Sequence, residues 1–511
     1  MLPLFTSDQM RAFDRRAIQD FGIPGAVLME NAALQALALI ESEFGDLELL
    51  TVGILCGPGN NGGDGFALAR QLFLRGCDVE LWLLCDPDKI SGDAKTNLGA
   101  TRTLDIPLNI PESADELDFS DYDLVVDAIF GTGMMRPPEG LVAEVIEYLN
   151  QTELPVLAID VPTGVNADTG EDVGTALDVT FTVTFQCGKP GLFLPPGRDR
   201  AGEVTVAPIS LPLSTKDLFS ADYFIPEFDD FAALFPNRPR DSHKGNFGKL
   251  LIVAGSRGMS GAARLAASAA LRSGAGLVVA AVPESIRGEV TRQPELMTVG
   301  LPETESGHLA AAAWEKLEPF VKWADAVAVG PGLGQEAETA GLLDKLLSYD
   351  RPLVLDADAL NLIASHNLLS QLPANTILTP HPGELERLTG KPLVSASSRI
   401  EAARVLTKAH KIVLHVKGST SATVGPNGKA YLNTTGNPGL ATGGSGDVLT
   451  GIIGSLLAQG IPSVPSCWGG AYLHGLAADI AADVLGEVSL LPSDVVNHLS
   501  SAFAELTPET E

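Results

Sequence analysis

The chain has 511 residues, and a prior of roughly 150 residues per domain predicts two to four domains. Apolar residues make up 45% of it, which is a globular composition. Its 64 acidic residues outnumber the 34 basic ones, the net charge is −30, and no run is rich in Lys or Arg. This charge excludes nucleic acid and anionic membranes as partners. An anionic substrate must therefore be held by backbone donors, a bound cation or a few placed basic side chains.

The cysteines and the start of the chain indicate the compartment. The cysteines form no C-x-x-C pair and no metal-ligand spacing, which indicates a reducing compartment and no structural zinc. The chain begins without a basic segment followed by an apolar core, and no apolar run spans a bilayer without Gly or polar breaks. We expect a cytoplasmic protein with no signal peptide. The five cysteines are Cys56, Cys77, Cys85, Cys187 and Cys467.

The first half alternates helices and strands. Thr6-Ser-Asp-Gln9 has capping-box spacing and predicts a helix start. A second helix is predicted over Ala26–Phe44, then a buried strand over Leu49–Cys56, a Gly-rich turn and a helix near Phe66–Arg75. This alternation predicts a mostly parallel sheet covered on both faces. The apolar side of the second helix is Leu28, Leu34, Leu37 and Ile40, and further strands are Val79–Leu84, Leu124–Ile129, Val156–Ile159 and Val179–Phe185.

The alternation of strands and helices stops around Leu211–Arg240. This stretch is acidic and contains the prolines Pro212, Pro226, Pro236 and Pro239. We interpret residues 216–240 as the connection between a domain at 1–215 and a domain at 241–505. The halves share no obvious repeat, so we expect two different folds. The strands predicted in the second half are Lys249–Ala254, Leu277–Ala281, Ala326–Val329, Leu353–Leu355, Thr376–Leu378 and Ile412–Val416.

A glycine-rich segment, Gly57–Gly65, follows the first strand. It contains G-x-G-x-x-G, and Glu80 lies 18 residues past Gly62, so a dinucleotide-binding Rossmann unit is one reading. Against it, Glu80 stands near the start of the next strand rather than its end, and Asn60–Asp64 is unusually polar for a pyrophosphate turn. Asn and backbone carbonyls suit a hard cation or the polar edge of a ligand. A plain strand-to-helix turn capped by Asp64 is the structural alternative.

Two further strand ends carry polar residues. Asp127 ends one strand and leads into Gly131–Pro137, and Asp160 ends another and leads into Thr163-Gly164. Ligands of open parallel sheets bind beyond the carboxyl ends of the strands. We therefore expect both aspartates and the Asn60–Asp64 segment to converge on one cleft.

Residues 1 to about 210 resemble the NAD(P)H-hydrate epimerase domain. The resemblance rests on Leu28-Met-Glu-Asn31, Asn60-Asn-Gly-Gly-Asp-Gly65, Asp127 with Gly131-Thr-Gly133, Asp160-Val-Pro-Thr-Gly164 and Lys189-Pro-Gly191. It implies that the hydrated dinucleotide is bound by Asn60, Asn61, Gly62, Gly63, Asp64, Gly131, Thr132, Gly133, Met134, Met135, Arg136, Pro137 and Asp160.

The same resemblance implies a potassium ion bound by Asn61, Asp127 and Thr163. Thr163 stands where many relatives carry Ser, and either hydroxyl can be a ligand. Epimerisation at the hydroxyl-bearing carbon needs a reversible proton exchange that opens and recloses that centre. We expect Asp160 to do this acid–base work, with Lys189 as the second candidate.

The second half has its own set of strand-end motifs. Lys249–Ala254 leads into Gly255–Ala263 and a small-residue helix, and Gly330–Gly334 is a second glycine turn. Asp356 and Asp358 follow another strand. His381 stands between two prolines that fix its backbone, which favours a binding role. Lys417–Ser421 offers a lysine and hydroxyls that suit a nucleotide phosphate or ribose.

The turn Gly443-Gly-Ser-Gly-Asp447 opens an apolar helix. Successive glycines expose N–H groups toward a helix N-terminus, which makes an anion site without Lys or Arg. Phosphate would repel an aspartate there, so Asp447 is predicted to be a base that takes a proton from a hydroxyl attacking phosphorus. Asp447 as a simple helix cap is the alternative. The turn lacks P-loop spacing.

This turn resembles that of ribokinase-like kinases, and residues from about 240 to 505 resemble ADP-dependent NAD(P)H-hydrate dehydratases more closely. The resemblance rests on His243-Lys-Gly245, Gly255-Ser256 with Gly261-Ala262, Gly330–Gly334, Thr379–Glu384 and residues 437–451. It implies hydrate contacts from Ala262, Gly332, His381 and Asp447, and ADP contacts from Lys417, Gly418, Ser419, Thr420, Ser421 and Gly446.

The dehydratase resemblance also implies a mechanism. Asp447 activates the hydroxyl of the hydrated ring, the nucleotide phosphorylates it, and phosphate elimination restores the reduced nicotinamide. A magnesium ion would bridge the phosphates, with Asp356 and Glu384 as candidate carboxylates near it.

Together these patterns predict an α/β protein with an N-terminal Rossmann-like αβα sandwich and a C-terminal ribokinase-like αβα sandwich. The implied function is bifunctional repair: epimerisation of R and S NAD(P)H hydrate, and dehydration of the S form with ADP, or ATP, giving AMP and phosphate when ADP is used. The alternative is a ribokinase-like ATP-dependent small-molecule kinase with an appended ligand-binding domain. Because relatives are commonly oligomeric, we expect a homo-oligomer.

Overall fold

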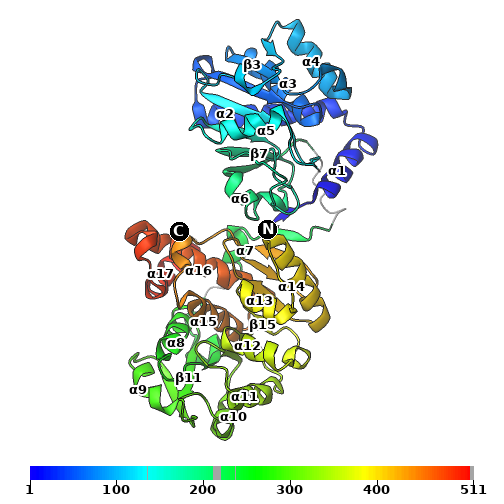
Figure 1. Cartoon of the computed structure of the whole chain (residues 1–511). Coiled ribbons are helices and arrows are strands. Elements are labelled where there is room, and N and C mark those ends of the chain that lie inside the picture. The colour runs from blue at the N-terminus through cyan, green and yellow to red at the C-terminus, as the bar shows by residue number, and fades with distance from the viewer. Residues whose placement is uncertain (135, 211–219, 236–237, 507–511) are drawn as a thin grey trace. The chain divides into compact units, whose positions relative to one another are not determined.

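The computed structural model describes residues 1–134, 136–210, 220–235 and 238–506. The chain forms two compact units, Leu2–Tyr223 and Phe224–Glu511 with Met1. Each unit is an α/β structure with helices packed on a sheet (Figure 1). The two-sandwich fold class predicted from the sequence is confirmed.

The N-terminal unit contains a seven-stranded parallel sheet with the order β4-β3-β2-β5-β6-β7-β8. The strand order reverses between β2 and β5, which is where ligands bind in open sheets. The strands are β2 (Thr51–Cys56), β3 (Asp78–Leu83), β4 (Leu108–Asn109), β5 (Leu124–Ala128), β6 (Val156–Ile159), β7 (Phe181–Phe185) and β8 (Glu203–Ala207), preceded by β1 (Leu2–Leu4). The helices are α1 (Ser7–Gln19), α2 (Gly25–Phe44), α3 (Asn60–Phe73), α4 (Gly92–Thr103), α5 (Leu141–Leu149) and α6 (Gly197–Arg200).

Helices cover both faces of this sheet. Leu55 and Val125 belong to an apolar cluster that includes the buried side of α5. Their strand neighbours Ile54 and Ala128 lie against Gly65 of α3 on the opposite face. Successive strand residues point to opposite faces, so β2 and β5 are buried from both sides.

The predicted start of α1 is confirmed, since Thr6 and Gln9 form a reciprocal capping box. Helix α2 begins at Gly25, and its predicted apolar side is buried except for Leu34, which is only partly buried.

Helix α3 begins at Asn60, so the prediction of a helix starting near Phe66 was wrong. The polar, glycine-rich segment forms the first turns of the helix instead of a loop. A side chain at Gly62 would come within 2.0 Å of the Gly57 carbonyl oxygen, and one at Gly65 within 2.7 Å of Ala128 Cβ. These glycines therefore serve close helix–sheet packing, which overrides their poor helix propensity. Gly59 is the N-cap and no side chain caps the helix, so Asp64 is not a cap.

The sheet of the C-terminal unit runs β18-β17-β16-β15-β14-β13-β10-β11-β12 across its main body. All these pairs are parallel except β16–β17 and β17–β18. The strands are β9 (Tyr223–Ile225), β10 (Lys249–Val253), β11 (Leu277–Pro283), β12 (Met297–Leu301), β13 (Ala326–Val329), β14 (Leu353–Leu355), β15 (Ile377–Leu378), β16 (Val413–Val416), β17 (Ala422–Val424) and β18 (Ala430–Leu432).

The helices of this unit are α7 (Phe228–Ala232), α8 (Ser260–Arg272), α9 (Arg287–Val290), α10 (Trp314–Trp323), α11 (Ala337–Leu347), α12 (Asp358–Ser365), α13 (Pro382–Thr389), α14 (Ala396–His410), α15 (Ser445–Ala458), α16 (Ser463–Leu485) and α17 (Pro492–Leu506). In both units, every strand predicted from the sequence is present with its ends within two residues. The structure adds β1, β4, β8, β9, β12, β17 and β18, which the sequence did not predict.

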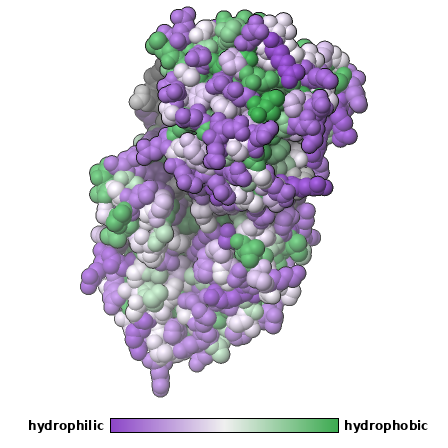
Figure 2. All heavy atoms as spheres, turned by 45° about the horizontal axis from the view of Figure 1, so that its top comes forward, coloured by the Kyte–Doolittle hydropathy of each residue, from purple (hydrophilic) through white to green (hydrophobic). Residues whose placement is uncertain are grey.

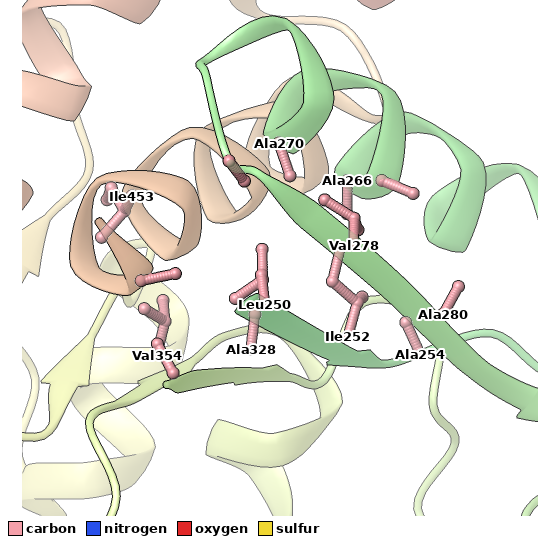
Figure 3. Close-up of a cluster of buried hydrophobic side chains, with 14 of the residues drawn as sticks. Leu250, Ile252, Ala254, Ala266, Ala270, Val278, Ala280, Ala328, Val354 and Ile453 are labelled. Carbon is pink, nitrogen blue, oxygen red and sulfur yellow. The ribbon is translucent and has the colours of Figure 1, made fainter. Parts of the chain in front are cut away.

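Small residues bring two helices close to the C-terminal sheet. Figure 3 shows Ala266 and Ala270 of α8 and Ile453 of α15 meeting Leu250, Ile252 and Val278 of the strands. A side chain at Gly451 would come within 2.1 Å of the Ala266 carbonyl oxygen. This close packing fixes α15, and therefore the turn that precedes it, on the sheet.

Part of the predicted connection at 216–240 belongs to the C-terminal unit. Phe231 of α7 is fully buried, stacks on Tyr472 with ring centroids 3.5 Å apart, and meets Trp468 edge to face at 5.0 Å. Residues 216–219 and 236–237, and the prolines at 212 and 236, lie outside the described residues. The domain limits 1–215 and 241–505 stay a prediction.

Hydrophilic residues predominate on the face of the molecule in Figure 2, with apolar residues scattered among them. Across the part of the chain that the structure describes, no helix is both long and apolar enough to cross a membrane.

Candidate active sites

A pocket of about 780 Å³ opens in the N-terminal unit. Its walls come from the ends of β5 and β6, the N-terminus of α3, and parts of α1 and α2. The predicted site residues that line it are Asn60, Asn61, Asp64, Gly131, Thr132, Gly133, Met134, Arg136, Pro137, Asp160 and Lys189. The structure thus brings the three predicted strand-end motifs together.

Four predicted residues of this half lie elsewhere. Gly62 and Gly63 are buried within α3, and Asp127 and Thr163 are buried in the unit, so none of the four lines the pocket. Met135 lies outside the described residues.

Asp160 and Lys189 form an ion pair at the pocket. The Lys189 ammonium donates to Asp160 Oδ1 at 2.7 Å, Thr184 Oγ1 at 2.8 Å and the Phe185 carbonyl oxygen at 3.1 Å. Both residues line the pocket, and Lys189 is fully buried whereas Asp160 is partly exposed. Asp160 has a φ of 71°, a left-handed conformation that a non-glycine residue adopts at a cost. The backbone therefore holds its carboxylate at the strand end.

Two more carboxyl groups share this pocket. Burial raises the pKa of Asp64 well above its usual value, and the nearby Asp160 and Asp14 add to the rise. Burial also raises the pKa of Asp14, with Asp160 adding to the rise and Lys189 opposing it. Asp14 on α1 was not predicted, because no motif marks it among the charged residues of that helix. The pocket therefore holds two carboxyl groups, Asp64 and Asp14, whose pKa values are raised mainly by burial.

Asp127 and Thr163 form a buried pair below the pocket. The Thr163 backbone N–H donates to Asp127 Oδ2 at 2.7 Å and its hydroxyl donates to Oδ1 at 2.8 Å. Burial raises the pKa of Asp127 to about 6, although these bonds oppose the shift. The third predicted potassium ligand, Asn61, is buried with its Nδ2 unpartnered within the described residues. A side chain at Gly131 would meet both Asn61 Oδ1 and Asp160 Oδ2, so Asn61 adjoins Asp160.

In the C-terminal unit, the turn Gly443–Ser445 enters α15. Gly444 is the N-cap with a φ of 106°, and no side chain caps the helix. Asp447 stands in the first turn and is not a cap, which excludes the alternative of a simple cap. Burial raises the pKa of Asp447 to about 6; Asp356 and Asp358 add to the rise and Lys417 opposes it.

Lys417 reaches this turn from the end of β16. Its ammonium donates to Asp356 Oδ1 at 2.6 Å, and Thr450 Oγ1 donates to Asp356 Oδ2 at 2.7 Å. A side chain at Gly446 would lie 3.1 Å from the Lys417 ammonium. The rest of the predicted ADP segment continues toward β17: Gly418 and Ser419 are exposed, Thr420 is buried and Ser421 is partly buried.

The predicted hydrate contacts Ala262 and Gly332 lie side by side. Gly332 has a φ of 59°, and a side chain there would come within 3.2 Å of Ala262 Cβ. Ser256 donates to the Gly332 carbonyl oxygen at 2.8 Å. Asp358 accepts the Gly334 N–H at 2.8 Å. Because Asp358 also acts on Asp447, this glycine turn adjoins the Asp447 region.

His381 has a structural role that the sequence analysis did not predict. It is the N-cap of α13, where its Nδ1 accepts the N–H of Gly383 at 3.1 Å and of Glu384 at 3.4 Å. Glu384 returns a bond, since its Oε2 accepts the His381 N–H at 2.9 Å. Burial lowers the pKa of His381, and the nearby Lys417 and Arg387 lower it further. The half-exposed ring remains neutral and lies near Lys417.

Comparisons with known proteins match both units. A family model described as NAD(P)H-hydrate dehydratase matches residues 250–500, and one described as YjeF-related protein N-terminus matches residues 25–191. A bifunctional NAD(P)H-hydrate repair enzyme from Moorella thermoacetica is 40% identical over 521 residues, which cover 99% of this chain and 98% of the relative. The chain belongs to the family of bifunctional NAD(P)H-hydrate repair enzymes.

Two solved structures resemble the dehydratase half of this repair-enzyme family member. A ribokinase-like superfamily protein from Enterococcus faecalis is 28% identical with a TM-score of 0.50, and covers 57% of this chain and 98% of that chain. An ADP/ATP-dependent NAD(P)H-hydrate dehydratase from Bacillus subtilis, co-crystallised with ATP and Mg²⁺, is 30% identical with a TM-score of 0.48, and covers 55% and 98%. The family and the enzyme class predicted from the motifs are confirmed.

Proposed function

We propose that this chain carries out both repair reactions of its family. The N-terminal unit interconverts the R and S epimers of NAD(P)H hydrate, and the C-terminal unit dehydrates the S epimer using ADP or ATP. The observation that carries the proposal is an aspartate beside a lysine in each unit. Asp160 at the end of β6 lies beside Lys189, and Asp447 at the start of α15 lies near Lys417. Reduced dinucleotides as substrates fit a cytoplasmic enzyme, the compartment that the cysteine spacing predicts.

In the epimerase reaction, Asp160 takes the proton from the ring hydroxyl. The bond between that carbon and the ring nitrogen then breaks, leaving a carbonyl, and it reforms from the other face as the proton returns. The Lys189 ammonium donates to Asp160 Oδ1 at 2.7 Å and so holds the carboxylate in place at the pocket. Since Lys189 is buried with three acceptors, it orients the base rather than exchanging protons itself.

The residues Asn61, Asp127 and Thr163 fit a potassium ion. They offer amide, carboxylate and hydroxyl oxygens, and hard cations prefer oxygen ligands. The structure records no cationic side chain against the buried Asp127 within the described residues, so a cation would offset a charge that burial disfavours. Bound there, potassium would supply positive charge near an anionic substrate in an otherwise acidic protein.

In the dehydratase reaction, Asp447 takes the proton from the ring hydroxyl, whose oxygen attacks the terminal phosphorus of the nucleotide. With ADP, AMP leaves. Phosphate then departs with the hydroxyl oxygen, and loss of a proton from the adjacent ring carbon restores the double bond. The N-terminus of α15 and the Lys417 ammonium would hold the nucleotide phosphates.

A magnesium ion would be held mainly by the nucleotide phosphates, as is usual for this metal. Both carboxylates predicted near it already accept protein bonds: Asp356 from Lys417 and Thr450, and Glu384 from the His381 backbone. The metal would supply charge neutralisation to the phosphates.

The test uses the whole chain with purified R and S hydrates of NADH. With ADP or ATP and Mg²⁺, the S hydrate should be converted to NADH, and the R hydrate should follow through epimerisation. Absence of NADH with both nucleotides would sink the dehydratase assignment, and a stable phosphorylated product would show a small-molecule kinase. We also expect the homo-oligomer implied by the family, which light scattering measures.

A further inference from the structure

We propose that Asp356 is a positioning residue of the dehydratase site, which keeps Lys417 at the phosphate-binding turn and away from the base Asp447. The inference rests on the proposed dehydratase function and assigns to Asp356 a role other than metal binding. It is carried by two contacts that join two strand ends and a helix.

Asp356 ties together elements that are distant in sequence. It follows β14, whereas Lys417 follows β16, and β15 lies between these strands in the sheet. The bond from Lys417 to Asp356 Oδ1 therefore crosses the end of β15. The bond from Thr450 to Oδ2 joins the same carboxylate to the second turn of α15. Each carboxylate oxygen has one short donor, so the group is held from two sides.

The backbone also holds this carboxylate in place. The Asp356 N–H donates to the Val329 carbonyl oxygen at 3.0 Å, and its own carbonyl accepts the Ala359 N–H at 3.1 Å. A side chain at Gly330 would come within 1.8 Å of the Asp356 carbonyl oxygen, so only glycine allows this approach. The next residue, Ala357, has a φ of 51°, a conformation that costs alanine roughly 1 kcal/mol. Such strain persists only where the surroundings demand it.

Lys417 needs a partner to hold it. A lysine stem is flexible, and its ammonium is a mobile point charge. Two carboxylates stand near it: Asp356, which it contacts, and Asp447, with which it interacts at longer range. If Lys417 turned to Asp447, it would stabilise the ionised form of that base and weaken it as a proton acceptor. By occupying the ammonium, Asp356 leaves Asp447 available to the substrate hydroxyl.

The other charged groups around this trio do not replace Asp356. Asp358 faces Asp447 from the start of α12 but bonds to Gly334 and Gln335 rather than to Lys417. Two histidines near Lys417 are neutral, because burial lowers the pKa of His415 to about 3 and of His474 to about 4. On α13, His381 and Arg387 lie near Lys417 as well, and burial raises the pKa of Glu384 there.

The deciding variant is Asp356→Asn, assayed as kcat for the S hydrate at saturating ADP across a pH series. Without the carboxylate, Lys417 is free to pair with Asp447. The pKa of Asp447 then falls. The acidic limb of the pH profile, where kcat declines as Asp447 is protonated, should therefore move to lower pH by about one unit. Because a weaker base accepts the proton less readily, plateau kcat should fall about tenfold.

Two matched variants separate position from charge. Asp358→Asn removes a negative charge near Asp447 without releasing Lys417, so its limb should move less than that of Asp356→Asn. Adding Lys417→Met to Asp356→Asn removes the competing ammonium, so the limb should return toward its original pH. A merely structural role for Asp356 predicts no such return.

The proposal is overturned if Asp356→Asn leaves the limb in place, or if the double variant keeps the lowered limb. Failure of the unaltered chain to form NADH from the S hydrate would instead overturn the proposed function. Should Asp356→Asn not fold, Thr450→Val loosens the same carboxylate with all charges kept. It should lower kcat about threefold without moving the limb, since the carboxylate loses one hydroxyl donor while Lys417 keeps its partner; an unchanged kcat overturns the proposal.

Discussion

The two units each hold a lysine–aspartate ion pair at the carboxyl edge of their sheet, but the lysine is the buried partner in one pair and the aspartate in the other. In the N-terminal unit the Lys189 side chain is 2% exposed and Asp160 15%. In the C-terminal unit Asp356 is 2% exposed and Lys417 23%. The more exposed partner is therefore a carboxylate in one unit and an ammonium in the other.

This reversal follows the chemistry proposed for each site. An acid–base site needs a carboxylate that the substrate can reach, and a buried lysine behind it fixes the position of that carboxylate. A phosphate site needs an exposed cation, and a buried carboxylate behind it fixes that cation. In the C-terminal unit the proposed base is a separate residue, Asp447, which stands in the first turn of α15.

The largest expected effect is the loss of dehydration without any change in epimer exchange. Asp447→Asn removes the base of the dehydratase, so conversion of the S hydrate to NADH should fall about 10⁴-fold. Exchange between the epimers, followed by chromatography, should be unchanged, because the epimerase pocket lies within the other unit. Loss of both activities in this variant would contradict the assignment of one base to each unit.

The reciprocal variant is Asp160→Asn, which should slow exchange between the epimers about 10³-fold while dehydration of the S hydrate is kept. Asp20→Asn is the matched control, because Asp20 is an exposed aspartate that pairs with Arg16 outside the pocket. Exchange at the normal rate in Asp160→Asn would remove this residue from the mechanism.

The difference in burial also predicts which substitution lowers the free energy of unfolding more. Asp160→Asn leaves the buried Lys189 unpaired, and Lys417→Met leaves the buried Asp356 unpaired. Each should lower the free energy of unfolding of its unit by about 3 kcal/mol. Removing the buried partner instead, by Lys189→Met or Asp356→Asn, leaves a group that water reaches, so the loss should be about 1 kcal/mol.

Urea unfolding of all four variants measures these losses in the free energy of unfolding. The rank order should be set by which partner is exposed and not by whether lysine or aspartate is removed. Equal losses within each pair would show that the reversed burial has no energetic consequence.

Much of this arrangement could be predicted from the sequence, for a physical reason. Parallel strands end at one edge of a sheet, so polar residues after predicted strands converge. Asp160 and Asn60 in the N-terminal unit meet in the pocket in this way. The enzyme family was also predicted from these motifs.

The remaining features depend on tertiary packing. Helix α3 starts at Asn60 because its glycines pack against the sheet, which propensity does not indicate. Asp14 reaches the pocket through the placement of α1. The ion pair of Asp356 and Lys417 joins residues 61 positions apart; both strand ends were predicted, but the direction of each side chain was not. The roles given to the individual site residues stay predictions.

The pH dependence of the dehydratase reaction tests the effect of burial on Asp447. Because the pKa of Asp447 is raised to about 6, mainly by burial, the base is ionised at pH 7 and becomes protonated below pH 6. Dehydratase kcat/KM for the S hydrate should therefore fall about tenfold for each unit below pH 6. Rates across a pH series with the unaltered chain measure the limb. A limb near pH 4, the usual range of an exposed carboxyl, would contradict the effect of burial on Asp447.

The smallest expected effect concerns Thr163, where many relatives are expected to carry Ser. Its hydroxyl donates to Asp127 Oδ1 and accepts the Phe130 N–H at 3.2 Å. Thr163→Ser keeps both bonds and removes only a buried methyl, so it should lower the free energy of unfolding by about 1 kcal/mol. Epimer exchange and its dependence on potassium should stay within about twofold of the unaltered chain.

The matched variant Thr163→Val keeps the methyl group and replaces the hydroxyl with a second methyl. The Phe130 N–H and Asp127 Oδ1 then lose a partner in the protein interior, which should cost about 2 kcal/mol. The potassium concentration that half-saturates epimer exchange should rise about tenfold, because one oxygen ligand is lost. If Val and Ser variants respond equally to potassium, the hydroxyl of Thr163 is not a ligand and serves only to hold Asp127.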